Sequence, residues 1–326
     1  MKKRREYVAV LAFLAAIIGI SGCSRQKEEK LTKYDTQFFE LFDTVTSVTG
    51  YARDEKTFQS YVDVFYDELK EYHQLYDIYN DYEGINNIKT INDHAGIEPV
   101  EVDDKIIQML EEAVDIYELT DGNMNVAMGS VLSIWHEYRE AGLKHPEQAQ
   151  LPPQEELEEA AKHMDIRKMV IDPEKKTVYL EDPDMSLDVG AIAKGYAAEM
   201  ASRKVEEAGL KHALISVGGN IRCIGTKPDG QKWVVGVQNP DTTSGERYLH
   251  RLGLDGISLV TSGTYQRYYT VDGVNYHHII HPELLKPWDR YSSVSILSAD
   301  SGMADALATA VFNMELEDGK KLIESQ

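Results

Sequence analysis

The sequence contains little cysteine, with two residues of this type, Cys23 and Cys223, among 326. This scarcity excludes the small disulfide-stapled scaffolds, so the stability of the fold must come from a hydrophobic core. Cys223 lies in the alternating apolar stretch 220–224. We expect it to be a small buried side chain, with a nucleophilic thiol as the alternative.

Positive charge is also scarce, because 34 Lys and Arg residues face 55 Asp and Glu residues and give a formal net charge of −21. A surface of this sign repels nucleic acid and offers no broad basic patch to anionic lipid head groups. Repeats and low-complexity segments are absent from the sequence, and its 42% hydrophobic residues are typical of a globular protein. We therefore expect no nucleic-acid partner, and membrane attachment would need an anchor.

The first residues have the layout of a bacterial lipoprotein signal. Basic residues 2–5 precede an apolar run at 7–20, and Ser21 and Gly22 precede Cys23. The run is shorter than the roughly 20 residues of a permanent spanning helix. We expect residues 1–22 to be a signal peptide and Cys23 to carry lipid such as palmitate on the extracytoplasmic face of a bacterial membrane. The alternative is an uncleaved membrane helix.

The rest of the chain predicts a polar tether at 23–33 and one α+β domain at 34–326, beginning near Tyr34. Apolar periodicity and turn residues favour mostly antiparallel sheets with packed helices. The expected helices cover about 58–76, 103–117, 155–163, 191–208 and 303–314. The expected strands cover 42–48, 169–171, 177–180, 213–217, 221–224, 233–237, 248–254, 257–260, 267–271, 274–280 and 293–297.

One candidate site segment is LDVGAIAKGYAAE (187–199), where an acidic residue ends an expected strand, a glycine turns the chain and a helix opens. Amides at a helix N-terminus favour anions, and Lys194 can add a point charge to a phosphate held there. The alternative is plain helix capping by Asp188 with a solvated Lys194.

Two further segments combine glycines, hydroxyls and histidines. ISVGGNIRCIG (215–225) runs from a strand into a glycine pair, which allows close backbone approach to a ligand or makes an ordinary turn. The hydroxyls and arginine of TSGTYQRYY (261–269) can bind phosphate, and the histidines of YHHIIHPE (276–283) could serve as a base or as metal ligands. The alternative is a polar edge hairpin. Adjacent histidines on a strand face opposite sides, so at most one is expected in a given site.

The fourth segment is SADSGMADALATAVF (298–312). Asp305 and Thr309 are four residues apart on an expected helix, so a carboxylate and a hydroxyl share one face. Their alanine neighbours let a backbone or cofactor approach, and oxygen ligands suit magnesium. The alternative is an acidic residue near the helix start with a threonine bonded to its own helix.

Together, in this order, the four segments resemble the ApbE family of FAD:protein FMN transferases, and the resemblance spans about residues 39–314. It implies a T-fold-like α+β domain that uses FAD and Mg²⁺. The implied reaction transfers FMN to a threonine hydroxyl of an acceptor flavoprotein with release of AMP.

The resemblance also implies roles for single residues. It places the magnesium ligands on the Ala191 carbonyl, Asp305 and Thr309, and the candidate catalytic residues on Lys194 and the base His278. The implied FAD contacts are Asp188, Lys194, Tyr79, Phe42, Asn123, Met124, Asn125 and Ile280, with Tyr79 stacking on the isoalloxazine.

This chain departs from the family pattern at His281, where an aspartate is usual. Gln326 also lies in an expected helix, whereas family members commonly continue for another strand, so a truncated C-terminus is an open reading. Two other functions stay open: a Mg-dependent FAD pyrophosphatase, with water replacing threonine, and a non-catalytic flavin-binding lipoprotein.

Overall fold

The computed structural model describes residues 30–241 and 243–326. The expected signal peptide, Cys23 and most of the expected tether lie outside the described residues. Within the described part of the chain, no helix combines the length and apolar content needed to cross a bilayer.

The fold is a mixture of helices and antiparallel strands, as predicted. The strands are β1 (Thr32–Phe38), β2 (Thr46–Ala52), β3 (Val100–Glu101), β4 (Met169–Asp172), β5 (Thr177–Leu180), β6 (Ala213–Val217), β7 (Asn220–Ile224), β8 (Trp233–Gln238), β9 (Tyr248–Leu254), β10 (Ser258–Gly263), β11 (Tyr268–Val271), β12 (Val274–His277) and β13 (Ser293–Ser298). The α-helices are α2 (Glu55–Tyr76), α3 (Ile88–Asp93), α4 (Asp104–Leu119), α5 (Gly129–Lys144), α6 (Gln154–Ala160), α7 (Ala193–Glu207), α8 (Ser301–Phe312) and α9 (Leu316–Glu324).

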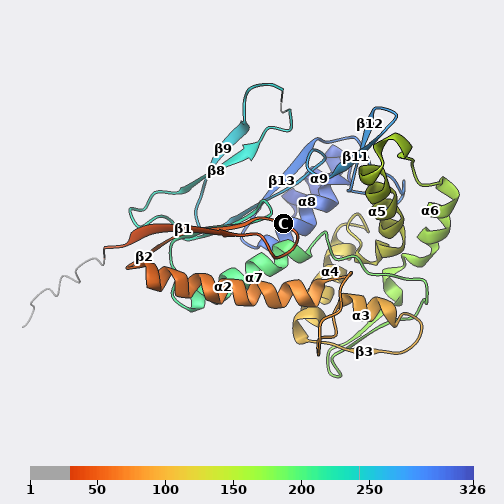
Figure 1. The fold of residues 1–326 in the computed structure, drawn as a ribbon, viewed down its shortest axis with the longest axis horizontal. Helices are drawn as coiled ribbons and strands as arrows, with labels where there is room; N and C mark the ends of the chain where they lie inside the picture. Colours follow the sequence, from red (N-terminus) through yellow and green to blue (C-terminus); the bar gives the residue numbers. More distant parts are fainter. Residues whose placement is uncertain (1–29, 242) are drawn as a thin grey trace, which may run out of the picture.

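The centre of the molecule is a six-stranded antiparallel sheet in the order β1-β2-β6-β7-β10-β13 (Figure 1). Strands β6 and β7 are joined by Gly218 and Gly219, whose φ angles of 58° and 96° are accessible mainly to glycine. A Cβ on Gly218 would lie 2.6 Å from the Thr44 hydroxyl oxygen. The glycine pair is therefore required by the turn and by its close approach to the segment before β2.

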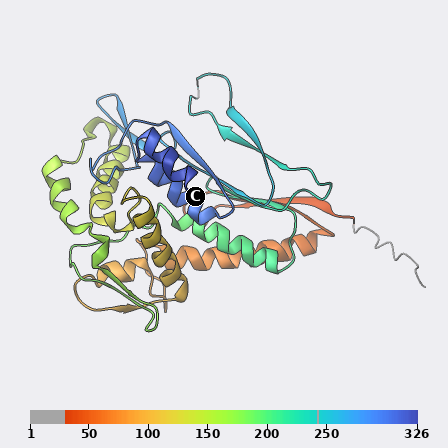
Figure 2. The ribbon, with the colours of Figure 1, turned by 180° about the vertical axis from the view of Figure 1, so that it is seen from behind.

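Helices α2, α7 and α8 cover one face of this sheet, and both views of the ribbon show α2 and α7 running alongside it (Figures 1 and 2). Helix α7 lies between α2, α8 and the sheet, which explains why nine of its residues are buried and why most of them are small. Small side chains let helices approach closely, so α7 is fixed on several sides at once.

Strands β8 and β9 form a separate hairpin that packs against the opposite face of the sheet. Trp233, Val235 and Val237 contact Cys223 and Leu259 there. Cys223 is fully buried, and burial raises the pKa of its thiol to about 12. The prediction of a buried structural cysteine is confirmed.

Helices α4 to α6 and the small sheet β3-β5-β4 form a helical lobe at one end of the main sheet (Figure 1). The β11–β12 hairpin packs on α5 through a core that includes Tyr269, Trp135 and Leu285. The Trp135 indole N–H donates to the Leu285 carbonyl at 2.8 Å. These contacts join the lobe to the C-terminal third of the chain.

Three sequence expectations are corrected by the structure. β1 begins at Thr32, inside the expected tether and before Tyr34, because Tyr34, Thr36 and Phe38 alternate inward along it. The strand expected at 42–48 is instead a turn followed by β2 from Thr46. The sequence did not lead us to expect α5. Its first residue is Gly129 and no side chain caps its N-terminus, so the usual signal of a helix start is missing.

A buried ionic network ties α7 to the sheet and to the start of α8. The Glu199 carboxylate, 1% exposed, accepts hydrogen bonds from Arg203 Nε and Arg222 Nε at 2.9 Å and from Ser301 N at 3.0 Å. Arg203 also bonds Asp300, which caps α8. One carboxylate thus orients three elements.

We expect Glu199→Ala to lower the free energy of unfolding by about 3 kcal/mol, because it removes the close partner of the buried Arg222 charge and leaves the more distant Glu206, at 3.6 Å. Urea unfolding followed by circular dichroism measures this. The control is Glu207→Ala, an exposed glutamate on the same helix, which should change stability by less than about 0.5 kcal/mol. Equal, small effects of both substitutions would show that the network does not hold α7.

Candidate active site

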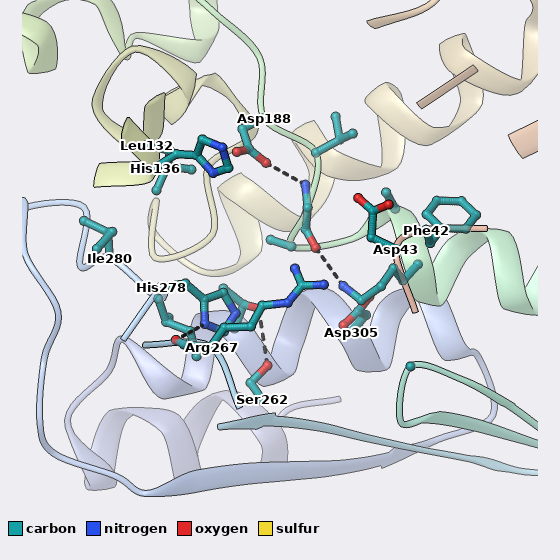
Figure 3. A pocket seen from close by; sticks show the side chains of 18 of the residues that line it. Phe42, Asp43, Leu132, His136, Asp188, Ser262, Arg267, His278, Ile280 and Asp305 are labelled. Carbon is teal, nitrogen blue, oxygen red and sulfur yellow. Dashed lines mark hydrogen bonds between the residues drawn. The ribbon is translucent and has the colours of Figure 1, made fainter. Parts of the chain in front are cut away.

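A cavity of about 600 Å³ opens where the turn before β2, the loop after α2, α5, the start of α7, the β11–β12 hairpin and α8 meet (Figure 3). Every described site residue predicted from the sequence lines it. These residues are Phe42, Tyr79, Asn123, Met124, Asn125, Asp188, Ala191, Lys194, His278, Ile280, Asp305 and Thr309. The structure thus brings together segments that are far apart in the sequence.

The floor of the cavity is the contact between α7 and α8. Gly195 N donates to Asp305 Oδ2 at 2.8 Å, and the Asp305 side chain belongs to a residue only 5% exposed. A Cβ on Gly195 would lie 2.3 Å from the Ser301 carbonyl oxygen and 2.4 Å from Asp305 Cβ. Only glycine therefore lets the two helices come this close.

The side chains and carbonyl on this floor that could coordinate a metal ion offer oxygen atoms. Burial raises the pKa of Asp305, while Lys194, the Gly195 N–H and Asn220 oppose the rise. No basic side chain of the described residues forms an ion pair with Asp305. A buried carboxylate in this situation favours a cation. Thr309 and Ala191 line the same cavity, and their hydroxyl and carbonyl oxygens are of the kind that could join Asp305 in holding a hard cation such as magnesium.

Thr309 is half-buried, and its Oγ1 lies 3.5 Å from Ser262 Oγ at the end of β10. It follows Asp305 by one helical turn, as the sequence predicts, so both groups face the same cavity. Within the described residues, this hydroxyl bonds Ser262 and not its own helix, which disfavours a purely local role of the threonine.

Asp188 lies in a segment without regular secondary structure and does not end a strand, contrary to the expectation. Its backbone N–H donates to the Val126 carbonyl at 2.8 Å, so it pairs with the segment before α5 and not with a sheet. Its Oδ1 accepts from Gly190 N at 2.8 Å, and Lys194 Nζ lies 3.3 Å from the Gly190 carbonyl oxygen (Figure 3). Burial raises the pKa of Asp188, and the Gly190 N–H and Lys194 counteract this.

Asp188 also does not cap α7. The N-cap residue of α7 is Ile192, which gives no side-chain cap. Of the first amides, Ala193 N bonds the Val189 carbonyl and Gly195 N bonds Asp305 Oδ2. The N-terminal end of the helix lines the cavity through Ala191, Ala193 and Lys194. The plain capping interpretation is therefore wrong, and the helix start is suited to an anion.

His278 follows the end of β12, and its Nδ1 lies 3.2 Å from the Arg267 carbonyl oxygen. A carbonyl only accepts, so Nδ1 carries the proton and Nε2 holds the lone pair. Burial lowers the pKa of His278 to about 3; the hydrogen bond to the Arg267 backbone opposes this, and the charges of Arg267, Lys194 and Arg139 add to it. The ring is neutral at pH 7.

The expectation that only one of the two adjacent histidines enters the site is wrong, because both line the cavity. β12 ends at His277, so the strict alternation of a strand does not extend to His278. The His277 ring is buried edge-on against Phe312, at 5.5 Å between ring centroids. His277 thus forms part of the wall.

His281, where the resemblance led us to expect an aspartate, holds a local turn. Its Nδ1 accepts from Glu283 N at 3.1 Å and Leu284 N at 3.2 Å, as a carboxylate oxygen would. Next to it, Asn313 Nδ2 lies 3.4 Å from the Ile280 carbonyl oxygen and 3.3 Å from that of Asn123. His281 and Asn313 thus fix the segment that follows β12.

The Phe42 side of the cavity is a turn with an unusual backbone. Phe42 and Asp43 have φ angles of 53° and 49°, a left-handed conformation that is costly for non-glycine residues. Phe42 N donates to His73 Nδ1 at 3.3 Å, and the two rings meet edge to face at 5.4 Å. Contacts with α2 thus hold the strained turn at the cavity.

The side chains of Asn123 and Asn125 are largely engaged within the protein. Asn123 Nδ2 donates to the Thr120 carbonyl at 2.9 Å, and Asn125 bonds Ala127 N and the Met164 carbonyl at 2.8 and 3.0 Å. They shape the segment between α4 and α5, and their remaining atoms face the cavity.

Sequence reasoning missed the wall formed by α5. Leu132, Trp135, His136 and Arg139 line the cavity, at the i, i+3, i+4, i+7 spacing of one helical face. That spacing, centred on Trp135, is the signal that identifies the helix. His136 lies beside Asp188 in Figure 3, and its ring packs against Tyr79 with 5.4 Å between centroids.

A second group of possible metal ligands lies outside the cavity. His163, Asp182 and Asp184 bring ligand atoms within 4.8 Å of one another. Lys168 Nζ already lies 2.7 Å from Asp182 Oδ2, and this hydrogen bond is the main cause that lowers the pKa of Asp182 to about 2. The cluster is thus charge-compensated by its own lysine.

Comparison with known proteins agrees with this architecture. The sequence model described as the ApbE family matches residues 42–326. The FAD:protein FMN transferase of Klebsiella pneumoniae (strain 342) is 31% identical over 241 residues, which cover 72% of this chain and 70% of that protein. The FAD:protein FMN transferase of Treponema pallidum (strain Nichols) is 34% identical over 250 residues, covering 72% and 67%.

Solved structures show the same fold. The crystal structure of an ApbE protein from Thermotoga maritima has a TM-score of 0.78 at 30% identity and covers 90% of this chain and 91% of its own. The flavin transferase ApbE from Vibrio cholerae has a TM-score of 0.74 at 25% identity, covering 90% and 92%.

We expect Gly195→Ala to lower the free energy of unfolding by about 1 to 3 kcal/mol, because the new methyl group meets backbone and Asp305 at the helix crossing. Thermal or urea unfolding measures the loss. Gly319→Ala is the matched control in α9, where the nearest atom is a Val311 methyl at 3.0 Å that can move. If Gly195→Ala is as stable as the control, the close contact of α7 and α8 is not tight.

His278 makes stability depend on pH. Its pKa is about 3 in the folded chain and near 6.5 when unfolded, so the unfolded chain binds more protons and stability falls as pH drops from 6.5 toward 3. In that window we expect His278→Gln to lose stability less steeply than the wild type, by up to about 1.4 kcal/mol per pH unit. Above pH 6.5 the two curves should be parallel.

Urea unfolding at a series of pH values checks this difference. His277 and His281 also have lowered pKa values, but they are present in both proteins and cancel. His145→Gln, an exposed histidine outside the cavity, should retain the slope of the wild type. Equal slopes for His278→Gln and the wild type would contradict a buried neutral His278.

Proposed function

The chain belongs to the ApbE family, and from this premise we propose that it is an FAD:protein FMN transferase that moves FMN from FAD to a threonine hydroxyl of an acceptor protein and releases AMP. One observation carries the proposal. The start of α7, with Lys194, and the Asp305 and Thr309 face of α8 meet at one cavity floor. That floor combines an anion site with a cation site, as a bound diphosphate requires.

The binding of FAD would use the whole cavity. The isoalloxazine would stack on Tyr79, with Phe42, Met124, Ile280 and the backbone near Asn123 and Asn125 around it. The diphosphate would lie at the start of α7, where the helix amides, Lys194 and Arg267 supply positive potential. Asp188 holds the turn at Gly190 that presents Lys194.

Asp305, Thr309 and the Ala191 carbonyl would hold a magnesium ion. When bound there, the ion supplies positive charge to the diphosphate and compensates the buried Asp305 carboxylate. The raised pKa of Asp305 agrees with a carboxylate that lacks such compensation in the protein alone.

In the proposed reaction the threonine oxygen forms a bond to the FMN-side phosphorus while the bond from that phosphorus to the bridging oxygen breaks. The bridging oxygen leaves with AMP. Lys194 stabilises charge on the phosphate oxygens, and positioning supplies most of the acceleration in this type of chemistry. His278 would accept the hydroxyl proton at Nε2, because Nδ1 is already bonded to the Arg267 carbonyl.

The low pKa of His278 fits this role only with substrate present. Burial is the main cause of the low pKa of His278, and the charges of its neighbours Arg267, Lys194 and Arg139 lower it further. A bound diphosphate neutralises those charges and raises the basicity of Nε2 as the reaction requires. The base is thus neutral beforehand and stronger when FAD is in place.

The proposal extends to location, on the ground of the sequence alone. Lipid on Cys23 would tether the domain to the extracytoplasmic face of a bacterial membrane. Acceptors would then be exported or membrane-linked flavoproteins with a threonine in a short motif rich in Ser, Gly and Ala. The negative charge of the chain leaves the lipid as the means of attachment.

Mass spectrometry of such an acceptor after incubation with the protein, FAD and Mg²⁺ tests the function. We expect a covalent FMN adduct on threonine, lost with a chelator and reduced at least a hundredfold in Asp305→Asn. Asp318→Asn, an exposed aspartate in α9, is the control and should retain the rate.

Other outcomes would point to other functions. Free FMN and AMP without an adduct would indicate an FAD pyrophosphatase, in which water replaces the threonine. Flavin binding that survives the chelator, with neither product, would indicate a non-catalytic binding protein. An adduct formed at full rate by Asp305→Asn would remove Asp305 from the mechanism.

A further inference from the structure

Two aromatic rings from separate elements meet at the wall of the cavity. Tyr79 lies in the loop after α2 and His136 lies on α5; their ring centroids are 5.4 Å apart and the planes are inclined by 32°. Both residues line the cavity. One side of the tyrosine ring is therefore in contact with the histidine.

The backbone of Tyr79 is held, but its ring has few contacts. Asp77 Oδ1 accepts from Tyr79 N at 2.7 Å and from Asn80 N at 3.1 Å, which fixes the loop. Tyr79 is nevertheless 56% exposed, so a large part of its side chain is open to the cavity and solvent. Among the described residues, His136 is the aromatic partner that orients the ring.

His136 is itself fixed. Arg139 Nη2 lies 2.8 Å from His136 Nδ1, and a guanidinium only donates, so Nδ1 accepts and a neutral His136 carries its proton on Nε2. The Arg139 side chain is 19% exposed and comes from the next turn of the same helix. The imidazole is thus held in one orientation behind Tyr79.

We propose that His136 is a positioning residue that backs Tyr79 and so makes it a rigid stacking platform for the isoalloxazine; this rests on the proposed function. An aromatic pair of this kind contributes about 0.5 to 1.5 kcal/mol. A ring that is already oriented loses less side-chain freedom when a planar ligand stacks on its open face. The pair favours the flavin end of FAD and does not act on the adenosine end.

Equilibrium binding of FAD, FMN and ADP, followed by quenching of flavin fluorescence and by calorimetry for ADP, tests this. We expect His136→Ala to weaken FAD and FMN binding roughly threefold to tenfold and to leave ADP binding unchanged. His136→Phe restores an aromatic partner and should recover most of the flavin affinity and the quenching. His145→Ala, an exposed histidine near the end of the same helix, is the matched control and should bind like the wild type.

Steady-state transfer gives a second readout, in which His136→Ala should raise KM for FAD with little change in kcat. Unchanged FMN affinity in His136→Ala would overturn the inference, as would equal losses for FMN and ADP or a failure of His136→Phe to recover affinity. If the wild type binds flavin without transferring it, only the proposed transferase function is refuted. The relative affinities of the variants for FAD, FMN and ADP then still test the role of His136. A wild type that binds no flavin would overturn both.

Discussion

The close contact between α7 and α8 is the constraint on which the site depends. Gly195 permits the approach, and its N–H bonds the buried Asp305 carboxylate at 2.8 Å. The same crossing is reinforced by Glu199, which bonds the start of α8 and Arg222 of β7. One carboxylate, Glu199 of α7, thus orders the scaffold. Another, Asp305 of α8, bonds α7 one helical turn earlier, at Gly195, and faces the cavity. The carboxylate that holds the fold, Glu199, and the carboxylate that faces the cavity, Asp305, therefore make separate contacts with neighbouring turns of α7.

The cavity contains both cationic side chains and carboxylates, a mixture that the overall charge of −21 does not reveal. Lys194, Arg139 and Arg267 line it together with the buried Asp305 and the half-buried Asp188. Burial, with the cations adding to it, lowers the pKa of His278, and burial raises the pKa of both carboxylates. An arrangement of this kind favours a ligand that carries negative charge at one end of the floor and brings a cation to the other.

Much of this could be predicted from the sequence, because the floor is built by local patterns. Asp305 and Thr309 share a helix face, and the Gly190 turn precedes α7 as the spacing indicates. The cavity walls formed by α5 and by the turn at Phe42 were not predicted. α5 lacks a capping signal, and the turn at Phe42 looks like a strand because Val45, Thr46 and Val48 follow it directly. In both cases tertiary contacts, to the β11–β12 hairpin and to His73, decide the conformation, and such contacts leave no local pattern.

The lining of the cavity runs from Phe42 to Asn313, so the first and last thirds of the described chain must be in place before the pocket exists. Pairings such as β2 with β6 join residues separated by well over a hundred positions. Loops of that length close late in folding. Ligand recognition is therefore withheld from any incompletely synthesised chain that lacks the last third.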